Sequence, residues 1–354
     1  MNMMFNGCTS LTSLDIHSFD TSNVTLMQFM FIYCGELTEL NVSHFDTSKV
    51  TNMGRMFYNC GKIRILDVSG WNTENVTDMS AMFFGCDSLE TLDVSNFKTS
   101  KVTDMSYMFW HCRNLTVLDV SHFDTSQVTT LSGMFNSCEK VVTLDVSGWN
   151  TENVTLMDFL FTYCKSLTAL NVSHWNTSKV LSMEYMFTFE SENLKTLNVS
   201  NFNTSNVLYM NNMFQGTHGL TSLDLSNFDT SKVQRMDYMF ESSINLSSIT
   251  LNFETPSLIS AAYLFSNCQR LVSIDLSKMD TSRITDMTNM FANCWSLSTI
   301  DIRNAIFDQV TGKDNLISNY QAITRIIVKD ENAKIFWQSL LGDKSSVVIT
   351  ASEL

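Results

Sequence analysis

The sequence predicts an α/β repeat solenoid, on three observations. A motif of 26 residues recurs about a dozen times along the 354-residue chain. All nine cysteines occupy the same position of that motif. Each copy opens with an aliphatic residue, and these residues follow at steps of 26, with one step of 27 and one of 25. A fixed period of this length indicates one unit that is copied and stacked, because a single copy cannot bury its apolar side chains alone. The opening position is held by Leu11, Leu37, Ile63, Leu89, Leu115, Val141, Leu167, Leu194, Leu220, Leu246, Leu271 and Leu297, with a degenerate copy at Ile323.

The first residues of each copy predict a short strand with one face buried. In the copy that opens at Leu37, Leu40 and Val42 are two residues apart, and the polar Asn41 lies between them. This alternation of apolar and polar residues is typical of a half-buried strand. Because every copy repeats it, we expect parallel strands along one face of the solenoid.

The second half of each copy predicts a turn and then a short helix or a tight helical turn. The Asp-Thr-Ser stretch at 46–48 offers side-chain oxygens that can turn and cap the backbone. The apolar residues that follow are spaced by three, three, one and three, as in Val50, Met53, Met56, Phe57 and Cys60. Such spacing places them on one helical face. We therefore expect a right-handed, leucine-rich-repeat-like coil with parallel strands on one face and short helices on the other.

Two regions are expected. Residues 1–328 should form the solenoid of about 12–13 repeats, with an incomplete N-terminal coil, because residues 1–8 already match the end of a copy. The sequence is therefore interpreted as a fragment or a truncated reading frame that begins inside a repeat, without a signal peptide. Residues 329–354 should form a C-terminal cap, with an amphipathic helix from Asp330 to Leu341 and a strand from Ser346 to Thr350.

Composition argues against several classes of function. The net charge is −14, the pI is about 4.7 and no basic run is present, so a nucleic-acid partner is not expected. No apolar stretch approaches the length of a transmembrane helix. No Ser/His/Asp or Cys/His set interrupts the repeat, and no Gly-rich phosphate loop occurs. We expect no enzyme and no cofactor, since active sites usually depart from local sequence rules. An enzyme within the last 50 residues is disfavoured, because that segment is short and lacks His and Cys.

The cysteine column could be a metal ladder, a series of disulfides or a row of buried thiols. Zinc sites favour Cys-x-x-Cys pairs, and none occurs. Disulfides need Cα atoms within about 7 Å, whereas helices packed side by side lie about 8–10 Å apart. Buried thiols are the preferred interpretation. The Met-Phe pairs are expected in the core, and the aromatic column that starts at Phe19, Phe45 and Trp71 as a stacked spine or, if exposed, as a carbohydrate surface.

An acidic column is the candidate binding face. Its Asp and Asn residues lie between buried strand residues, so they should point outward, about 4.8 Å apart on neighbouring strands. A basic partner could offset their charge, and so could Ca²⁺ with its oxygen ligands. Alternatively, the side chains only bond neighbouring backbone or hydroxyl groups on a solvated surface. The candidate residues are Asp67, Asp93, Asp119, Asp145, Asn171, Asn198 and Asp224.

The repeat closely resembles that of a known family. The segment Leu92 to Phe109, LDVSNFKTSKVTDMSYMF, resembles the 26-residue bacterial surface-protein repeat of the BspA-like leucine-rich-repeat proteins. This resemblance extends over about nine-tenths of the chain. It implies an extracellular, cell-surface-associated protein that contacts a surface or matrix macromolecule of a host or a neighbouring cell.

The expected function is therefore non-enzymatic adhesion or protein binding through the solenoid surface. The alternative is a structural stalk or spacer that presents another domain. A binding protein should show residues that depart from the repeat consensus and cluster on one outward face, whereas a spacer should not.

Overall fold

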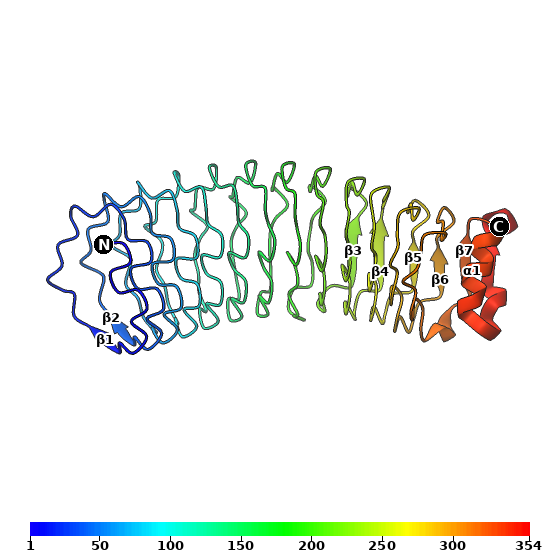
Figure 1. Cartoon of the computed structure of the whole chain (residues 1–354), viewed down its shortest axis with the longest axis horizontal. Coiled ribbons are helices and arrows are strands. Elements are labelled where there is room, and N and C mark those ends of the chain that lie inside the picture. Colours follow the sequence, from blue (N-terminus) through cyan, green and yellow to red (C-terminus); the bar gives the residue numbers. More distant parts are fainter. The chain divides into compact units, whose positions relative to one another are not determined.

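The computed structural model describes residues 1–354, which form a parallel-strand solenoid of about 13 turns. This finding confirms the predicted fold class. The solenoid divides into two compact units, Met1–Lys179 and Val180–Leu354. Within each unit, consecutive 26-residue copies lie side by side as successive coils (Figure 1). No helix in the chain combines the length and the apolar character that a bilayer span requires.

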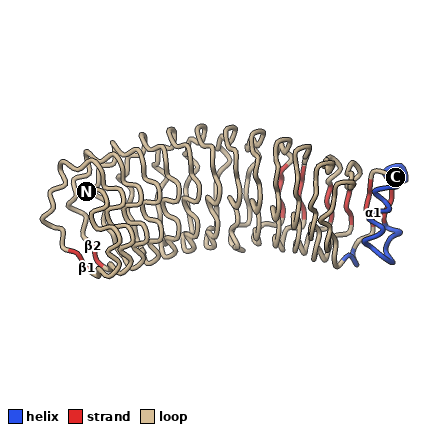
Figure 2. The backbone as a smooth tube through the Cα atoms, viewed as in Figure 1, coloured by secondary structure: helices blue, strands red, loops and turns tan.

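The strands are short, parallel and in register between equivalent positions of neighbouring copies. In the first unit, Ser13 pairs with Glu39, and isolated parallel bridges such as Ile65 to Thr91 continue the pattern. In the second unit, β3 pairs with β4, and β5 to β8 form a four-stranded sheet in sequence order. Most of each coil lies outside strands (Figure 2). The strands are β1 Ser13–Leu14, β2 Glu39–Leu40, β3 Ser222–Leu225, β4 Ser248–Leu251, β5 Ser273–Asp275, β6 Thr299–Asp301, β7 Arg325–Val328 and β8 Val348–Thr350.

The segments that were expected to be short helices are tight turns. Two residues in each of these segments adopt a left-handed backbone, as Arg55 (φ 55°) and Asn59 (φ 57°) do. Their N–H groups donate to the next coil, from Arg55 to the carbonyl of Ser80 at 2.8 Å and from Asn59 to that of Phe84 at 2.6 Å. Left-handed geometry costs a non-glycine residue about 1–2 kcal/mol, and these inter-coil bonds offset that cost. The prediction of helices was wrong here, and its alternative of a tight turn is confirmed.

The core consists of columns of identical side chains, as expected. Phe31, Phe57 and Phe83 are fully buried, and the neighbouring rings stack with centroids 5.6 and 5.8 Å apart. At the corner after the strand, Trp71 is 1% exposed and its Nε1 donates to the carbonyl of Val42 at 3.1 Å. The corner aromatics therefore form a buried spine, which removes the carbohydrate surface considered for this column.

The nine cysteines are free thiols, and all except the partly exposed Cys8 are buried. Each buried Sγ contacts the carbonyl oxygen of a Phe in the preceding coil, as between Cys112 and Phe83 at 3.2 Å. Where the column carries a serine, Ser243 Oγ makes the same contact to the carbonyl of Phe214 at 2.9 Å. Burial raises the pKa of the Cys86 thiol to about 12. The interpretation as buried thiols is confirmed.

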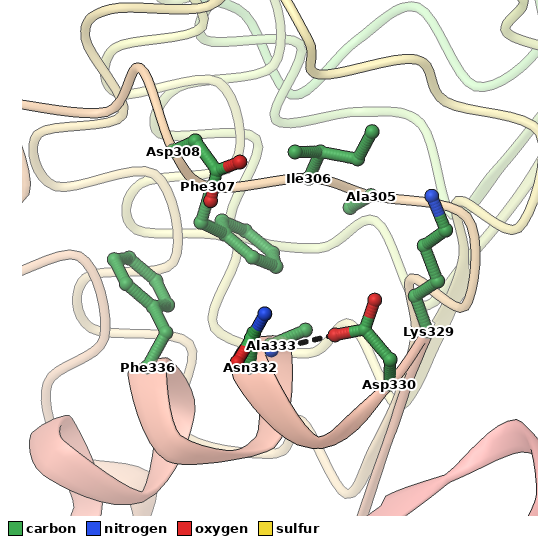
Figure 3. A pocket seen from close by; sticks show the side chains of 9 residues that line it. All are labelled: Ala305, Ile306, Phe307, Asp308, Lys329, Asp330, Asn332, Ala333 and Phe336. Carbon is green, nitrogen blue, oxygen red and sulfur yellow. Dashed lines mark hydrogen bonds between the residues drawn. The ribbon is translucent and has the colours of Figure 1, made fainter.

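The C-terminal segment carries the one α-helix, α1 Glu331–Leu341. Asp330 caps it by accepting a hydrogen bond from the N–H of Ala333 at 3.0 Å. Phe336 stacks on Phe307 of the preceding coil, with centroids 4.4 Å apart (Figure 3). Strand β8 follows and pairs with β7, so the helix and strand expected here are present. The division of the chain at residue 328 stays a prediction. Short 3-10 helices lie at Tyr320–Ala322, Gly342–Val347 and Ala351–Glu353.

Candidate functional site

The seven predicted acidic-column residues all lie on the outward side of the strand segments, which we call the strand side. Every one of them is exposed, while the residues before and after it point inward. Asp67, Asp93, Asp119, Asp145 and Asn171 follow each other on consecutive coils of the first unit. Asn198 and Asp224 lie on consecutive coils of the second unit. The stacking predicted from the sequence is therefore present within each unit.

Each side chain of the column closes a turn at the end of its strand. Asp119 Oδ1 accepts hydrogen bonds from the backbone N–H of Ser121 at 3.0 Å and from its hydroxyl at 2.7 Å. Asn171 Oδ1 accepts the same two bonds from Ser173, at 3.2 and 2.8 Å. Such turns need only a side-chain oxygen two residues before the donor. Asp and Asn are therefore equivalent for the fold, and they differ only in charge.

The carboxylates of the column are not paired with Lys or Arg, although the His122 side chain lies near Asp93 and Asp119. Hydrogen bonds from Ser95 and Ser121 hold the pKa of Asp93 and of Asp119 below the usual value, and His122 lowers both pKa values further. Repulsion from Asp119 opposes these effects on the pKa of Asp93. None of the seven residues forms an ion pair. No group of three or more His, Cys, Asp or Glu side chains is arranged to hold a metal ion.

The strand side also exposes apolar residues beside this column. Ile65 is 69% exposed and Val117 is 72% exposed, both two residues before an aspartate of the column. A shallow depression on this side is lined by Thr38, Glu39, Leu40, Asn41, Ser43, Arg64, Ile65 and Asp67. The surface is thus open, mainly polar and carries isolated apolar side chains.

A second feature lies on the turn side, the outward surface of the left-handed turns, and sequence reasoning missed it. Six aromatic rings from five coils of the first unit form a row, in which Trp110 contacts Phe159 across the coil of Gly133. The residue after each Met-Phe pair is small or polar in several copies, but it is aromatic in three consecutive ones, which was the available signal. We call this row the aromatic strip; it comprises Tyr33, Tyr58, Phe84, Tyr107, Trp110 and Phe159.

The turn side of the second unit has polar residues, Thr188, Gln215 and Glu241, at the position of Tyr58, Phe84 and Trp110, while Tyr238 and Tyr263 stack at the position of Tyr107. Asp237 is buried there, and its carboxylate accepts hydrogen bonds from Arg235 Nη2 at 2.8 Å and from the N–H of Ala262 at 3.0 Å. Asn211 Oδ1 in turn accepts the N–H of Asp237 at 3.0 Å. A shallow depression lies over these residues and is flanked by Tyr185 and Tyr238. The turn side of the second unit therefore adds buried charge that the turn side of the first unit does not show.

Solved structures match the chain at low sequence identity. A leucine-rich repeat protein from Bacteroides ovatus is 15% identical, with 94% of this chain and 83% of that chain covered and a TM-score of 0.49. A leucine rich cell surface protein from Faecalibacterium prausnitzii is 18% identical, with 86% and 76% covered and a TM-score of 0.38. The functional domain of InlJ from Listeria monocytogenes, which includes a cysteine ladder, is 20% identical, with 90% and 68% covered and a TM-score of 0.31. No curated protein matches the chain.

One family model matches nearly the whole repeat region. It is described as "Mycoplasma protein of unknown function, DUF285", and it matches residues 1–91, 56–166, 84–196, 138–223 and 219–329. These overlapping stretches run to the end of the 26-residue copies. The chain belongs to the DUF285 family.

Proposed function

We propose that this protein is a non-enzymatic binding scaffold of the BspA-like type, which acts outside the cell at a cell surface. Its partner is a surface or matrix macromolecule of a host or a neighbouring cell. The observation that carries the proposal is the acidic column, an ordered series of exposed carboxylates that form no ion pairs. The resemblance of the repeat at Leu92 to Phe109 supports the cellular setting.

The order of the column favours binding. Because each Oδ1 is already held by its turn, as in Asp119 and Asp145, these side chains lose little rotational freedom when a partner arrives. Their negative charge attracts basic surfaces over a distance and increases the rate of association. We propose a partner that presents Lys or Arg side chains to the strand side.

We propose no cofactor for this activity. Ca²⁺ between neighbouring carboxylates stays an alternative way to offset the charge, since Ca²⁺ takes six to eight oxygen ligands. A chelator distinguishes the two: contacts to Lys and Arg survive chelation, whereas a bridging Ca²⁺ is removed.

A structural spacer is the second candidate, and the inter-coil hydrogen bonds favour it. In the first unit, donors such as the N–H groups of Met53, Arg55 and Phe57 all bond to the next coil. Ladders of this kind stiffen a solenoid whether or not its surface binds anything.

The acidic column can be tested without disturbing the fold. The triple variant Asp67→Asn, Asp93→Asn, Asp119→Asn removes three charges but keeps every turn acceptor, because Asn171 makes the same turn. Exposed charge contacts contribute roughly 0.5 kcal/mol each, so the loss of three should weaken binding about tenfold. Surface plasmon resonance against purified matrix proteins, with and without chelator, measures this change.

The outcomes separate the candidates. An unchanged affinity in the folded triple variant removes the acidic column as the binding face. Absence of binding by the unaltered protein in both arms favours the spacer. The alanine variants at the same positions serve as a comparison, since they remove the turn acceptor as well as the charge.

A further inference from the structure

We propose that the aromatic strip is a docking surface for a protein segment that presents aliphatic or aromatic side chains with Lys or Arg along one edge. The strip and the acidic column lie on opposite sides of the core, because the strand and turn segments of a coil both point their apolar side chains inward. This inference therefore does not rest on the acidic column.

The fold does not require aromatic residues in the strip. Tyr58, Phe84 and Trp110 occupy the position after the Met-Phe pair. Other copies carry Thr188 and Ser266 at the equivalent position. The strip is nonetheless partly open to water: Tyr33 is 47% exposed and Tyr107 is 37% exposed. A contiguous exposed apolar patch is typical of an interaction site. Its departure from the repeat consensus on one outward face is the feature expected of a binding protein.

The rings are arranged so that their edges are the available surface. Tyr58 and Phe84 stack with centroids 4.3 Å apart and planes at 6°. Phe84 and Trp110 stack with centroids 5.8 Å apart and planes at 22°. Because neighbouring rings cover one another's faces, a sugar cannot lie flat on the central rings. Ring edges suit aliphatic side chains and the faces of partner aromatics.

Gly133 leaves room for this arrangement. It lies at the left-handed position of its turn (φ 61°), where neighbouring copies carry Tyr107 and Phe159. A Cβ at residue 133 would lie 2.4 Å from Cε3 of Trp110 and 2.7 Å from Cδ1 of Tyr107. Since other residue types tolerate the same backbone, space for the two rings is the reason for the glycine here.

One edge of the strip is neutral. Just after the strip position, a row of opposite charges joins four consecutive coils, from Asp87 to Lys165. Arg113 Nη1 lies 3.1 Å from Asp87 Oδ1, and Arg113 Nε lies 3.5 Å from Glu139 Oε1. Lys165 Nζ lies 3.4 Å from the other oxygen of Glu139. The opposite charges along this edge neutralise one another, so the edge has little net charge to attract a charged partner.

The other edge is acidic. The backbones of Asp78 and Asp104 form a parallel bridge between neighbouring coils, so their carboxylates lie at equivalent positions, and Asp104 lies three residues before Tyr107 of the strip. Their Oδ1 atoms accept the N–H groups of Ser80 and Ser106, each at 2.8 Å. Neither carboxylate forms an ion pair. Complementary charge is therefore expected from the partner, which selects a segment with basic residues on this side.

The experiment uses the whole chain and a phage-displayed library of random 12-residue peptides. Peptides are selected on the unaltered protein after depletion on the double variant Phe84→Thr, Trp110→Thr. Threonine is the native residue at this position in another copy, so the double variant keeps the fold. We expect enrichment of Leu, Ile, Phe, Met or Trp together with Lys or Arg. A synthetic copy of the leading peptide is then measured by fluorescence anisotropy.

The expected results are specific to the strip. The double variant should raise the Kd at least tenfold, and Gly133→Ala, which keeps all six rings but displaces two, should raise it as well. Asp104→Asn should weaken binding of the basic peptide, because it removes the charge and keeps the turn. The strand-side triple variant should leave the Kd unchanged, which separates this inference from the proposed function.

Three results would overturn the inference. These are a library without apolar enrichment, a Kd that is unchanged in both the double variant and Gly133→Ala, and binding of a neutral oligosaccharide such as maltoheptaose that is lost in the double variant. The last result would replace the protein segment with a glycan as the occupant of the strip.

Discussion

At several repeat positions, the residue type is set by the contact that its side chain makes to the adjacent turn or coil. At the strand end, an oxygen two residues before the donor closes the turn, so Asp119 and Asn171 are interchangeable there. In the thiol column, Cys112 and Ser243 each contact a Phe carbonyl of the preceding coil. The requirement at each position is for a small acceptor or donor of fixed reach, and this explains why residue types vary within a column.

The acidic column should make the protein sensitive to acid. Hydrogen bonds from the following serines lower the pKa of Asp119, Asp145 and Asp224. A folded pKa below the unfolded value means that the stabilisation is present above the ordinary Asp value of about 3.9 and is lost as the pH falls through the folded pKa. We expect a constant melting temperature from pH 7 to pH 5 and a decrease below about pH 4. Replacing these three residues by Asn should flatten that decrease, and an equally steep decrease would show that other groups cause it.

The thiols should differ sharply in reactivity. Cys8 is partly exposed, whereas the other eight are buried, and burial raises the pKa of Cys164 and Cys294 to about 12. Only the thiolate reacts readily. We expect iodoacetamide at pH 8 to modify Cys8 alone in the native protein and all nine in denaturant, as measured by mass spectrometry. Rapid modification of Cys112 in the native state would contradict the buried column.

At the scale of elements, the chain builds its coils from turns and short strands rather than from helices. The N–H groups of alternate residues, such as Met53 and Arg55, donate to the next coil, while that of Met56 donates within its own coil. A turn of this kind is stable only beside another copy. Helix α1 differs, because its backbone bonds are internal and only its apolar face must be covered.

Helix α1 should owe its position mainly to Trp337. This side chain is fully buried, with its ring 6.2 Å from Phe291 and 6.1 Å from Phe307. Trp337→Ala should lower the free energy of unfolding of this region by about 3–5 kcal/mol. Ile335→Ala on the same helix is the matched control, since Ile335 is 59% exposed and its replacement should cost less than about 0.5 kcal/mol. Urea unfolding followed by circular dichroism compares them, and equal effects would contradict the docking described here.

At the scale of the whole molecule, the repeat makes stability additive. Each coil contacts its neighbours in sequence, so the unfolding free energy is approximately a sum of coil and interface terms. Equivalent positions pair in register, as Ser222 with Ser248 does. Adding or removing a whole coil leaves equivalent residues of the remaining coils in contact. Changing the length of one coil shifts its residues out of register with its neighbours, unless the extra or missing residues lie in a loop.

Coil deletions test this additivity. Removal of residues 115–140, one copy of 26 residues, should give a folded protein with a cooperative but lower melting transition. Removal of residues 115–127 alone places strand residues against turn residues, and we expect it to abolish the cooperative transition. Circular dichroism melts of both proteins provide the measurement, and similar melts for the two deletions would count against register as the basis of the fold.

The spacing of particular residues predicted some features of the fold and left others open. The spacing of Leu40 and Val42 predicted the strand side, and the common phase of the cysteines predicted the buried column. The spacing of Met53, Met56 and Phe57 fits a helix and a pair of tight turns equally well, because both point these side chains inward. The left-handed residues Arg55 and Asn59 decide between them. Asn is enriched in this backbone region, but Arg55 and the tyrosines at its position in other copies are not, so the sequence carries only part of the signal.

The sequence by itself determined the solenoid, its register and which side of each strand meets water, because a period of 26 residues with alternating polarity leaves one way to bury the apolar columns. Only the tertiary structure decided that Tyr33, Tyr107 and Phe159 join Tyr58, Phe84 and Trp110 in one surface. These three rings occupy other positions of the copy than Tyr58, Phe84 and Trp110, so the 26-residue period alone does not place them beside that column.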